Sequence, residues 1–325
     1  MKTAIFFILF SSGIFGLPAI AQDSNAFNPR KFSFNGYVKD MLTAQVNPDF
    51  QNPIYENLVH NRINFEYYPS SRLSFGIGVR NRIFYGDRVK LYSDFGRSFG
   101  SLLEQQNNNY LFDLSNVWVD QEKFTFHTIA DRLWVKLTLN KWEISLGRQR
   151  INWGRNTVWN PNDLFNTYSY FDFDYEERPG ADALRIQYFK DFTSSIELAV
   201  APRDSMEAST IAGYYSFNKA NYDIQLIGSY FRNHAATGVG WSGYIGEGGF
   251  KGEATYFYPL KGQNTYSGNK NGYLITSVGG SYTFSNGITL NAEALYSGNE
   301  APVNIQDLMN SGSGLQANNL SLFKY

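Results

Sequence analysis

Apolar and polar residues alternate with a period of two along most of this chain. In the segment 72–84, one face carries Leu73, Phe75, Ile77 and Val79, and the other carries Ser74, Gly76, Gly78, Arg80 and Arg82. Such alternation is typical of a β-strand that has one apolar and one polar face. It predicts about thirteen strands, near residues 32–45, 58–68, 72–84, 132–139, 142–152, 178–190, 194–202, 210–218, 222–232, 238–246, 249–259, 272–285 and 288–296.

The connections between these segments alternate between short and long. Tight turns are predicted at residues 69–71, 140–141, 191–193, 219–221, 247–248 and 286–287. Long polar segments are predicted at residues 46–57, 85–126, 153–177, 203–209, 233–237, 260–271 and 300–316. Transmembrane β-barrels sort their connections in this way, with short periplasmic turns and longer outer loops, whereas a secreted β-sandwich has no reason to do so.

The pattern therefore predicts an all-β fold, an antiparallel up-and-down transmembrane β-barrel of about 14–18 strands if the chain is complete. A closed single-chain barrel needs an even number of strands, so one more strand must follow the thirteenth. Either residues 314–325 form that strand, or the chain is a fragment that lacks several strands. The poor alternation of residues 321–325 favours a fragment.

The first residues predict the compartment. Residues 1–21 combine a basic start at Lys2, an apolar run and the small residues Ala19 and Ala21, which are the parts of a cleaved secretory signal peptide. An uncleaved membrane anchor is the alternative, and the shortness of the apolar run speaks against it. We therefore expect a signal peptide at 1–21 and an outer-membrane barrel at 22–325.

Composition narrows the classes of function. The chain has no cysteine, which excludes a disulfide framework, a thiol nucleophile and an acylated N-terminal cysteine. Its formal net charge of −1 gives no reason to expect a nucleic-acid partner. The three histidines are far apart, and neither H-E-x-x-H nor G-x-S-x-G occurs. We expect no enzymatic activity, no cofactor and no metal site.

The stretch from 147 to 183 holds the densest candidate chemistry. Strict alternation from Trp142 onward would place Arg148 and Arg150 on the lipid face. Because a charge there costs about 2–4 kcal/mol at mid-membrane, a bulge at Gly147 that turns both arginines into the lumen is expected. The alternative is that both lie above the hydrocarbon, where the cost falls to about 0–1 kcal/mol.

The loop at 153–177 is expected to fold into the barrel and constrict it, because its aromatic side chains need a place to be buried. The positive side of this constriction is expected to consist of Arg80, Arg82, Arg148, Arg150, Arg155 and Arg178, and the negative side of Asp163, Asp172, Asp174 and Glu176. The alternative is a surface loop that ordinary salt bridges hold in place.

Alternation also predicts the wider lining of the lumen. The expected lumen face is mixed in sign, with Arg62, Arg80, Arg82, Arg132, Lys136 and Arg185 against Glu66, Glu143, Glu197, Glu253 and Glu293. A basic excess near the loop favours anions, whereas mixed lining is also typical of a general polar pore or of a hydrogen-bonded barrel interior.

Three motifs within residues 131–202 carry a resemblance. The segments L-G-R-Q-R-I-N-W-G, W-N-P-N-D-L-F-N and D-Y-E-E-R-P-G-A-D-A resemble an uncharacterised family of Bacteroidota outer-membrane barrels, which is distantly similar to porins and alginate-export channels. The resemblance implies an outer-membrane location and transport, and it supplies no catalytic residues. Porins generally fold their third outer loop inward, and the matching loop here is 153–177. Members of that family are longer than this chain, which agrees with a fragment.

The expected function is a porin-like outer-membrane channel for the passive diffusion of small hydrophilic solutes. Its expected partners are membrane lipid and these solutes, and a homo-oligomer or an envelope protein partner is compatible with the fold. A plugged barrel that acts as a scaffold in an envelope export or surface-assembly complex is the alternative. An outer-membrane hydrolase is a lesser alternative, which would need a Ser or Asp beside His60, His127 or His234.

Overall fold

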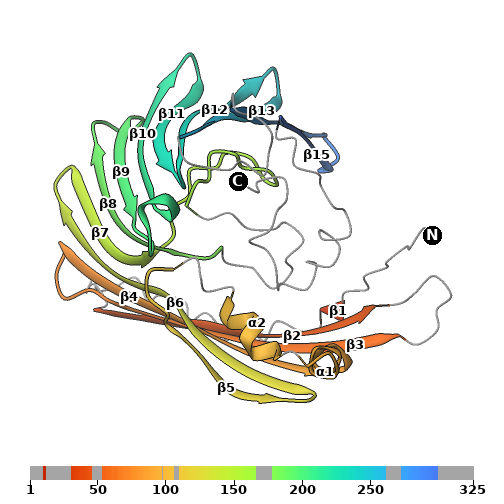
Figure 1. Cartoon of the computed structure of the whole chain (residues 1–325). Helices are drawn as coiled ribbons and strands as arrows, with labels where there is room; N and C mark the ends of the chain where they lie inside the picture. The colour runs from red at the N-terminus through yellow and green to blue at the C-terminus, as the bar shows by residue number, and fades with distance from the viewer. Residues whose placement is uncertain are drawn as a thin grey trace, which may run out of the picture. The chain divides into compact units, whose positions relative to one another are not determined.

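The computed structural model describes residues 10–11, 31–45, 53–96, 98–105, 110–165, 178–260 and 272–298. The strands pair antiparallel in one sheet and follow each other in chain order from β1 to β15, except that β5 pairs with β6 beside this path (Figure 1). The prediction of an all-β, antiparallel, up-and-down sheet is confirmed. Most of the predicted signal peptide and all of the predicted last strand lie outside the described residues.

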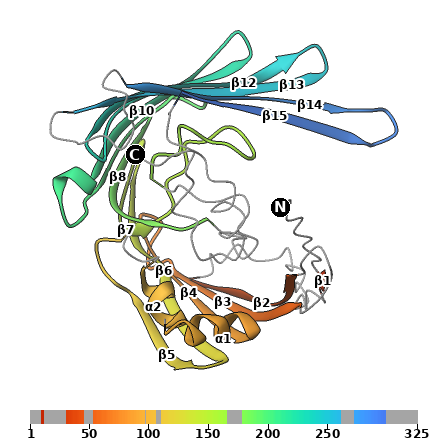
Figure 2. The same cartoon turned by 45° about the vertical axis from the view of Figure 1, so that its right-hand side comes forward.

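The chain forms two compact units, residues 1–135 and 136–325. The elements of the first unit are β1 (Phe10–Ser11), β2 (Phe32–Gln45), β3 (Ile54–Tyr67), β4 (Leu73–Gly86), α1 (Asp87–Asp94), α2 (Phe99–Gln105), β5 (Ser115–Gln121) and β6 (Phe124–Leu139), whose last residues belong to the second unit. The helix α1 contacts β3 and β4, and α2 contacts β5 (Figure 2).

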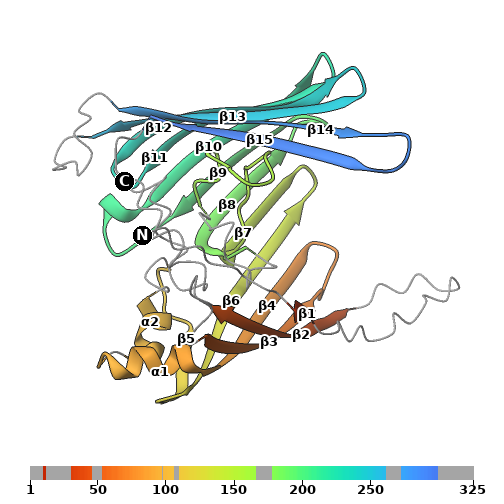
Figure 3. The same cartoon turned by 90° about the vertical axis from the view of Figure 1, so that its right-hand side faces the viewer.

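The second unit continues the sheet with nine strands and one short 3₁₀ helix. Its elements are β7 (Trp142–Gln149), β8 (Ala181–Phe189), β9 (Ser195–Ala201), η2 (Met206–Ala208), β10 (Thr210–Lys219), β11 (Tyr222–Phe231), β12 (His234–Ile245), β13 (Gly248–Pro259), β14 (Tyr273–Thr283) and β15 (Thr289–Ser297). Figure 3 shows these strands following one another in a curved sheet.

Each predicted strand corresponds to one observed strand, but two predicted connections are wrong. The segment 85–126, predicted as one long loop, contains α1, α2, β5 and the start of β6. The segment 233–237, predicted to be long and polar, is a tight turn, because Arg232 and Asn233 adopt positive φ angles of 45° and 65° and β12 begins at His234. Two consecutive residues at positive φ close a hairpin without further residues.

The two faces of the sheet differ sharply in chemistry. One face, called the exposed face here, carries apolar side chains open to the surroundings, among them Val38, Leu42, Ile63, Phe65, Phe75, Ile77 and Leu133 in the first unit and Leu184, Ile196, Leu198, Ile211, Leu226, Val239, Leu274 and Val278 in the second. The opposite face, called the buried face here, carries polar side chains shielded from solvent, among them His60, Arg62, Arg80, Arg82, His127 and Asp131 in the first unit and Gln187, Glu197, Gln225, Glu253, Thr255 and Ser277 in the second.

This distribution is the inverse of that in a water-soluble protein, which buries its apolar side chains and exposes its charged ones. A continuous apolar surface of this kind marks contact with a partner or with lipid. Within the described residues, no helix is long and apolar enough to cross a membrane.

The close pairing of β2 with β3 depends on a glycine. A Cβ at Gly36 would collide with the backbone carbonyl oxygen of Arg62 on β3, whereas a Cβ at Gly228 on β11 would meet nothing within 4 Å. We expect Gly36→Ala to lower the free energy of unfolding by about 1–3 kcal/mol, because a backbone atom must move to relieve the overlap. Gly228→Ala is the matched control. Equal stability of the two variants in urea titrations would contradict the expectation.

Candidate functional site

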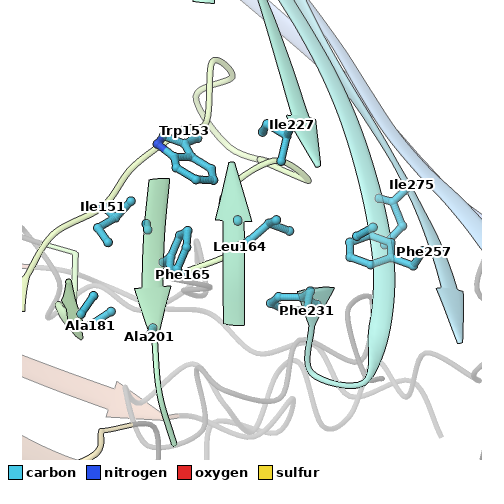
Figure 4. Packing of buried hydrophobic residues seen from close by; sticks show 14 of the residues in the cluster. Ile151, Trp153, Leu164, Phe165, Ala181, Ala201, Ile227, Phe231, Phe257 and Ile275 are labelled. Atoms are coloured by element: carbon cyan, nitrogen blue, oxygen red, sulfur yellow. The ribbon is translucent and has the colours of Figure 1, made fainter. Parts of the chain in front are cut away.

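The segment between β7 and β8 lies against the buried face of the second unit. Its described part, Ile151–Phe165, is called the inner segment here and has no helix or strand. Four of its side chains, Ile151, Trp153, Leu164 and Phe165, are buried in the apolar cluster of this unit (Figure 4). The strands contribute Ala181, Ala183, Ala199, Ala201, Ala212, Ile227, Phe231, Ala236, Phe257, Tyr273 and Ile275 to the same cluster.

The small size of the alanines in this cluster explains how a chain segment fits over a sheet. A methyl side chain leaves the backbone of the strand accessible to the aromatic rings that lie on it. Trp153 stacks on Tyr214 of β10, with ring centroids 5.1 Å apart, and meets Phe165 edge-on at the same centroid distance. Burial of these large rings is the main apolar contribution that holds the inner segment in place.

Two glutamates of the sheet bind the backbone of the inner segment. Glu253 on β13 accepts hydrogen bonds from the backbone N–H groups of Arg155, Asn156 and Asn162, and the last two bonds are both 2.9 Å long. Glu293 on β15 accepts the N–H groups of Thr157, Val158 and Trp159, the last at 2.7 Å. A segment without secondary structure has no backbone acceptors of its own for these N–H groups. The two carboxylates therefore supply the acceptors that a strand or helix would otherwise provide.

Side-chain hydrogen bonds also link the inner segment to the sheet. Gln225 on β11 donates to the carbonyl oxygen of Trp153 at 2.8 Å and accepts from Arg155 Nε at 2.9 Å. The indole N–H of Trp153 donates to Glu197 Oε2 at 3.0 Å, and Arg155 Nη2 donates to the hydroxyl of Tyr214 at 3.3 Å. The inner segment is therefore held by both its backbone and its side chains.

Two asparagines extend this network toward β12, β13 and β14. Asn162 accepts from the hydroxyl of Thr255 at 2.7 Å and donates to the carbonyl oxygen of Val239 at 3.1 Å. Asn156 donates to Ser277, whose hydroxyl donates in turn to the carbonyl oxygen of Trp159 at 2.7 Å. The turn residues that the sequence places in this loop thus bond to the sheet.

The structure separates the two arginines at the end of β7. Arg148 is buried and forms a bidentate pair with Asp182 of β8, with Nε–Oδ1 and Nη2–Oδ2 distances of 2.8 and 2.9 Å. Arg150 follows the end of β7 and is exposed. The prediction of a bulge at Gly147 is wrong, because the pairing of β7 with β8 runs through Gly147 without a shift and sets Arg148 opposite Asp182. Gly147 adopts a φ of 112°. This angle favours glycine.

Asp163 lies on the inner segment, outside the strands, and is buried. It forms an ion pair with Arg178, with an Nη1–Oδ2 distance of 3.4 Å. The pKa of Asp163 is raised to about 7, chiefly because the group is buried; the charge of Glu253 also raises it, whereas Arg178 and Arg150 lower it. The carboxyl group of Asp163 therefore changes its charge near neutral pH.

The remaining predicted residues are placed as follows. Arg80 and Arg82 lie on β4, on the buried face of the first unit. The acids Asp172, Asp174 and Glu176 lie outside the described residues. Within the second unit, Arg155, Asp163 and Arg178 belong to the inner segment and its contacts, whereas Arg148 binds a separate partner.

The sequence did not predict which side chains of the sheet form hydrogen bonds with the inner segment. Alternation predicted that Glu253 and Glu293 face the lumen, but not that each binds three backbone N–H groups. The roles of Gln225, Tyr214 and Asp182 were not predicted either. The only signal available was their polarity at positions of the buried face.

The described residues hold no group of three or more His, Asp or Glu side chains placed to bind a metal ion. Two of the histidines have structural partners, since Arg82 bonds to His127 Nδ1 at 3.3 Å and His234 Nδ1 lies 3.0 Å from the carbonyl oxygen of Arg232.

Comparison with solved structures gave weak similarities, among them two bacterial proteins. The sequence matches no family model and no curated protein. The low-pH structure of Pseudomonas putida OprB is similar over 82% of this chain and 77% of that chain, with 11% identity and a TM-score of 0.43. Salmonella typhi OmpF in complex with daunomycin is similar over 82% of this chain and 78% of that chain, with 12% identity and a TM-score of 0.45.

The Glu253 carboxylate should be essential to the placement of the inner segment. Glu253→Ala leaves three buried N–H groups without their acceptor, and we expect it to lower the free energy of unfolding by about 3 kcal/mol. Glu247→Ala, at the exposed tip of the hairpin that contains β13, is the matched control. Urea unfolding and limited proteolysis of the segment 150–165 measure the effect. Unchanged stability and unchanged cleavage would refute the role of Glu253.

Asp163 should make stability depend on pH. Because its folded pKa of about 7 lies above the ordinary aspartate value of 3.8, protonation favours the folded state, and stability rises as pH falls through 7. Between pH 7.5 and 5.5 we expect a gain of about 2 kcal/mol from this group. In Asp163→Asn, which mimics the protonated form, this part of the pH dependence should vanish. Parallel pH profiles of the two proteins in urea titrations would contradict the assignment.

Proposed function

We propose that this chain is an outer-membrane channel through which small hydrophilic solutes diffuse. The observation that carries the proposal is the inverted polarity of the sheet, with apolar side chains on the exposed face and charged side chains on the buried face. An antiparallel sheet with these two faces suits a lipid environment outside and a polar passage inside. The absence of cysteine agrees with export, and the predicted signal peptide at 1–21 supplies the route.

The inner segment is the element that narrows this passage in our proposal. Its backbone is bonded to Glu253 and Glu293, and its apolar side chains are buried, so it occupies space against the inner side of the sheet. The charged side chains proposed to face the solute are Arg148, Arg150, Arg155, Asp163 and Arg178 in the second unit, with Arg80 and Arg82 in the first. We also propose that Asp172, Asp174 and Glu176, which lie outside the described residues, form the negative side of this passage.

No catalytic step is part of the proposed function. Passage depends on the size of the opening and on the field of its charged groups, and neither needs a cofactor.

Planar-bilayer recording of the purified full-length protein tests the proposal. We expect stepwise conductance increases, as each inserted molecule opens one aqueous path. The double variant Glu253→Ala/Glu293→Ala should conduct more than the wild type, because six backbone N–H groups lose their acceptors and the inner segment is released. Glu247→Ala should conduct as the wild type does.

Two other outcomes would change the conclusion. A protein that inserts but never conducts favours the plugged barrel, a reading that the firm attachment of the inner segment also supports. Equal conductance of the wild type and the double variant would mean that the inner segment does not set the width of the passage.

A further inference from the structure

Two cationic side chains of the second unit, Arg155 and Lys251, are bonded to neutral acceptors. Arg155 lies on the inner segment, and Lys251 lies on β13, two positions before Glu253 and on the same face of that strand. Both side chains are partly exposed. Within the described residues neither forms an ion pair, whereas Arg178 and Arg185 in the same unit each pair with a carboxylate.

The guanidinium of Arg155 is held in one position by two side chains. Its Nε donates to Gln225 Oε1 at 2.9 Å, and its Nη2 donates to the hydroxyl of Tyr214 at 3.3 Å. Gln225 is fixed in turn, because its Nε2 donates to the carbonyl oxygen of Trp153 at 2.8 Å. Gly240 lies directly opposite Gln225 in the sheet, and a Cβ there would lie 2.5 Å from this Nε2. The guanidinium is therefore placed by neutral groups of the sheet.

Lys251 reaches the inner segment from β13. Its Nζ donates to the hydroxyl of Thr157 at 2.7 Å. Gly279 on β14 lies directly opposite Lys251, and a Cβ there would lie 3.5 Å from Cε of Lys251, so the stem of the lysine runs beside this glycine. Because Thr157 follows Arg155 by two residues, the two cations lie along the same stretch of the inner segment.

Both cations keep N–H donors that have no acceptor within the described residues. A guanidinium has five N–H groups and an ammonium has three, whereas Arg155 uses two and Lys251 uses one. The nearby carboxylates of Glu253 and Glu293 are occupied by the backbone of the inner segment. A solute that passes here therefore gains most when it brings acceptor oxygens that carry negative charge.

We propose that Arg155 and Lys251 determine the solute preference of the passage and select small anions that carry a carboxylate or phosphate group. A guanidinium binds such a group through parallel hydrogen bonds, and an ammonium adds a compact point charge. Since both cations stay partly exposed to water, binding is weak enough for the solute to leave again, as conduction requires. The proposal rests on the proposed channel and names its class of solute.

Reversal potentials of the full-length protein in planar bilayers, recorded across a gradient of potassium chloride, test this preference. We expect the wild type to prefer chloride over potassium. Arg155→Gln and Lys251→Gln should each lower the permeability ratio of chloride to potassium about threefold, because each removes one unit charge beside the path of the ion. Lys219→Gln removes a lysine from the exposed end of β10 and is the matched control, which should keep the wild-type ratio.

Inorganic phosphate, added at constant ionic strength, tests the recognition of acceptor oxygens. In the wild type we expect phosphate to reduce the chloride current in a saturable way, since an oxyanion accepts several charge-assisted hydrogen bonds at once. Arg155→Lys keeps the charge but not the guanidinium. This variant should therefore keep the preference for chloride and lose part of the phosphate effect.

Three results would overturn the proposal while the channel itself stands. They are a wild type that prefers potassium, a permeability ratio that is unchanged in both glutamine variants, and a chloride current that phosphate leaves unchanged. Arg155→Gln also removes the bonds to Gln225 and Tyr214 and can loosen the inner segment. Lys251→Gln keeps those bonds, so its ratio decides where the two variants disagree.

A protein that inserts but stays silent would refute the channel instead. Isothermal titration of the same protein in detergent micelles with inorganic phosphate then tests the two cations alone. Saturable binding that Lys251→Gln weakens and Lys219→Gln does not would uphold their role in binding an oxyanion. Absence of saturable binding would overturn that role as well.

Discussion

The burial of polar side chains on one face of the sheet is the constraint on which the rest of the structure depends. Alternation along each strand turns every second side chain to this face, and the sequence places charges and amides there. Gln225 and Glu253 are fully buried, and Arg62 is 1% exposed. Groups of this kind are stable away from water only when hydrogen-bonded or paired, so each strand requires partners that a sheet alone does not supply.

In the second unit, the chain supplies those partners itself. The inner segment lacks secondary structure and presents backbone N–H donors, while Glu253 and Glu293 present carboxylate acceptors. The donors and the acceptors satisfy each other, because a buried N–H group or a buried carboxylate without a partner would destabilise the fold. The alanines of β8, β9, β10 and β12 allow the segment to come close enough for these bonds. Apolar packing and polar pairing thus act together on one segment.

The period-two pattern was sufficient to predict the order of the strands and the face that each side chain takes, because these follow from backbone geometry alone. It was insufficient where tertiary contacts decide. The turn at Arg232 and Asn233 places two non-glycine residues at positive φ, and only the asparagine is of a type that favours this conformation. The helices α1 and α2 lie in a stretch without strand alternation, and they are placed by their contacts with β3, β4 and β5. The link between Glu253 and Asn162 likewise joins residues ninety-one positions apart.

The buried polar side chains of the first unit are paired in a different way. Its buried face is rich in donors, and guanidinium groups cannot accept hydrogen bonds from one another. Asp131 matches Arg62, and His127 uses its one acceptor on Arg82. Each of these arginines therefore bonds to acceptors on other groups, and acceptors with a negative charge bind it most strongly. The two units thus differ in the charge of their buried faces, since the carboxylates Glu253 and Glu293 of the second unit are occupied by the backbone of the inner segment.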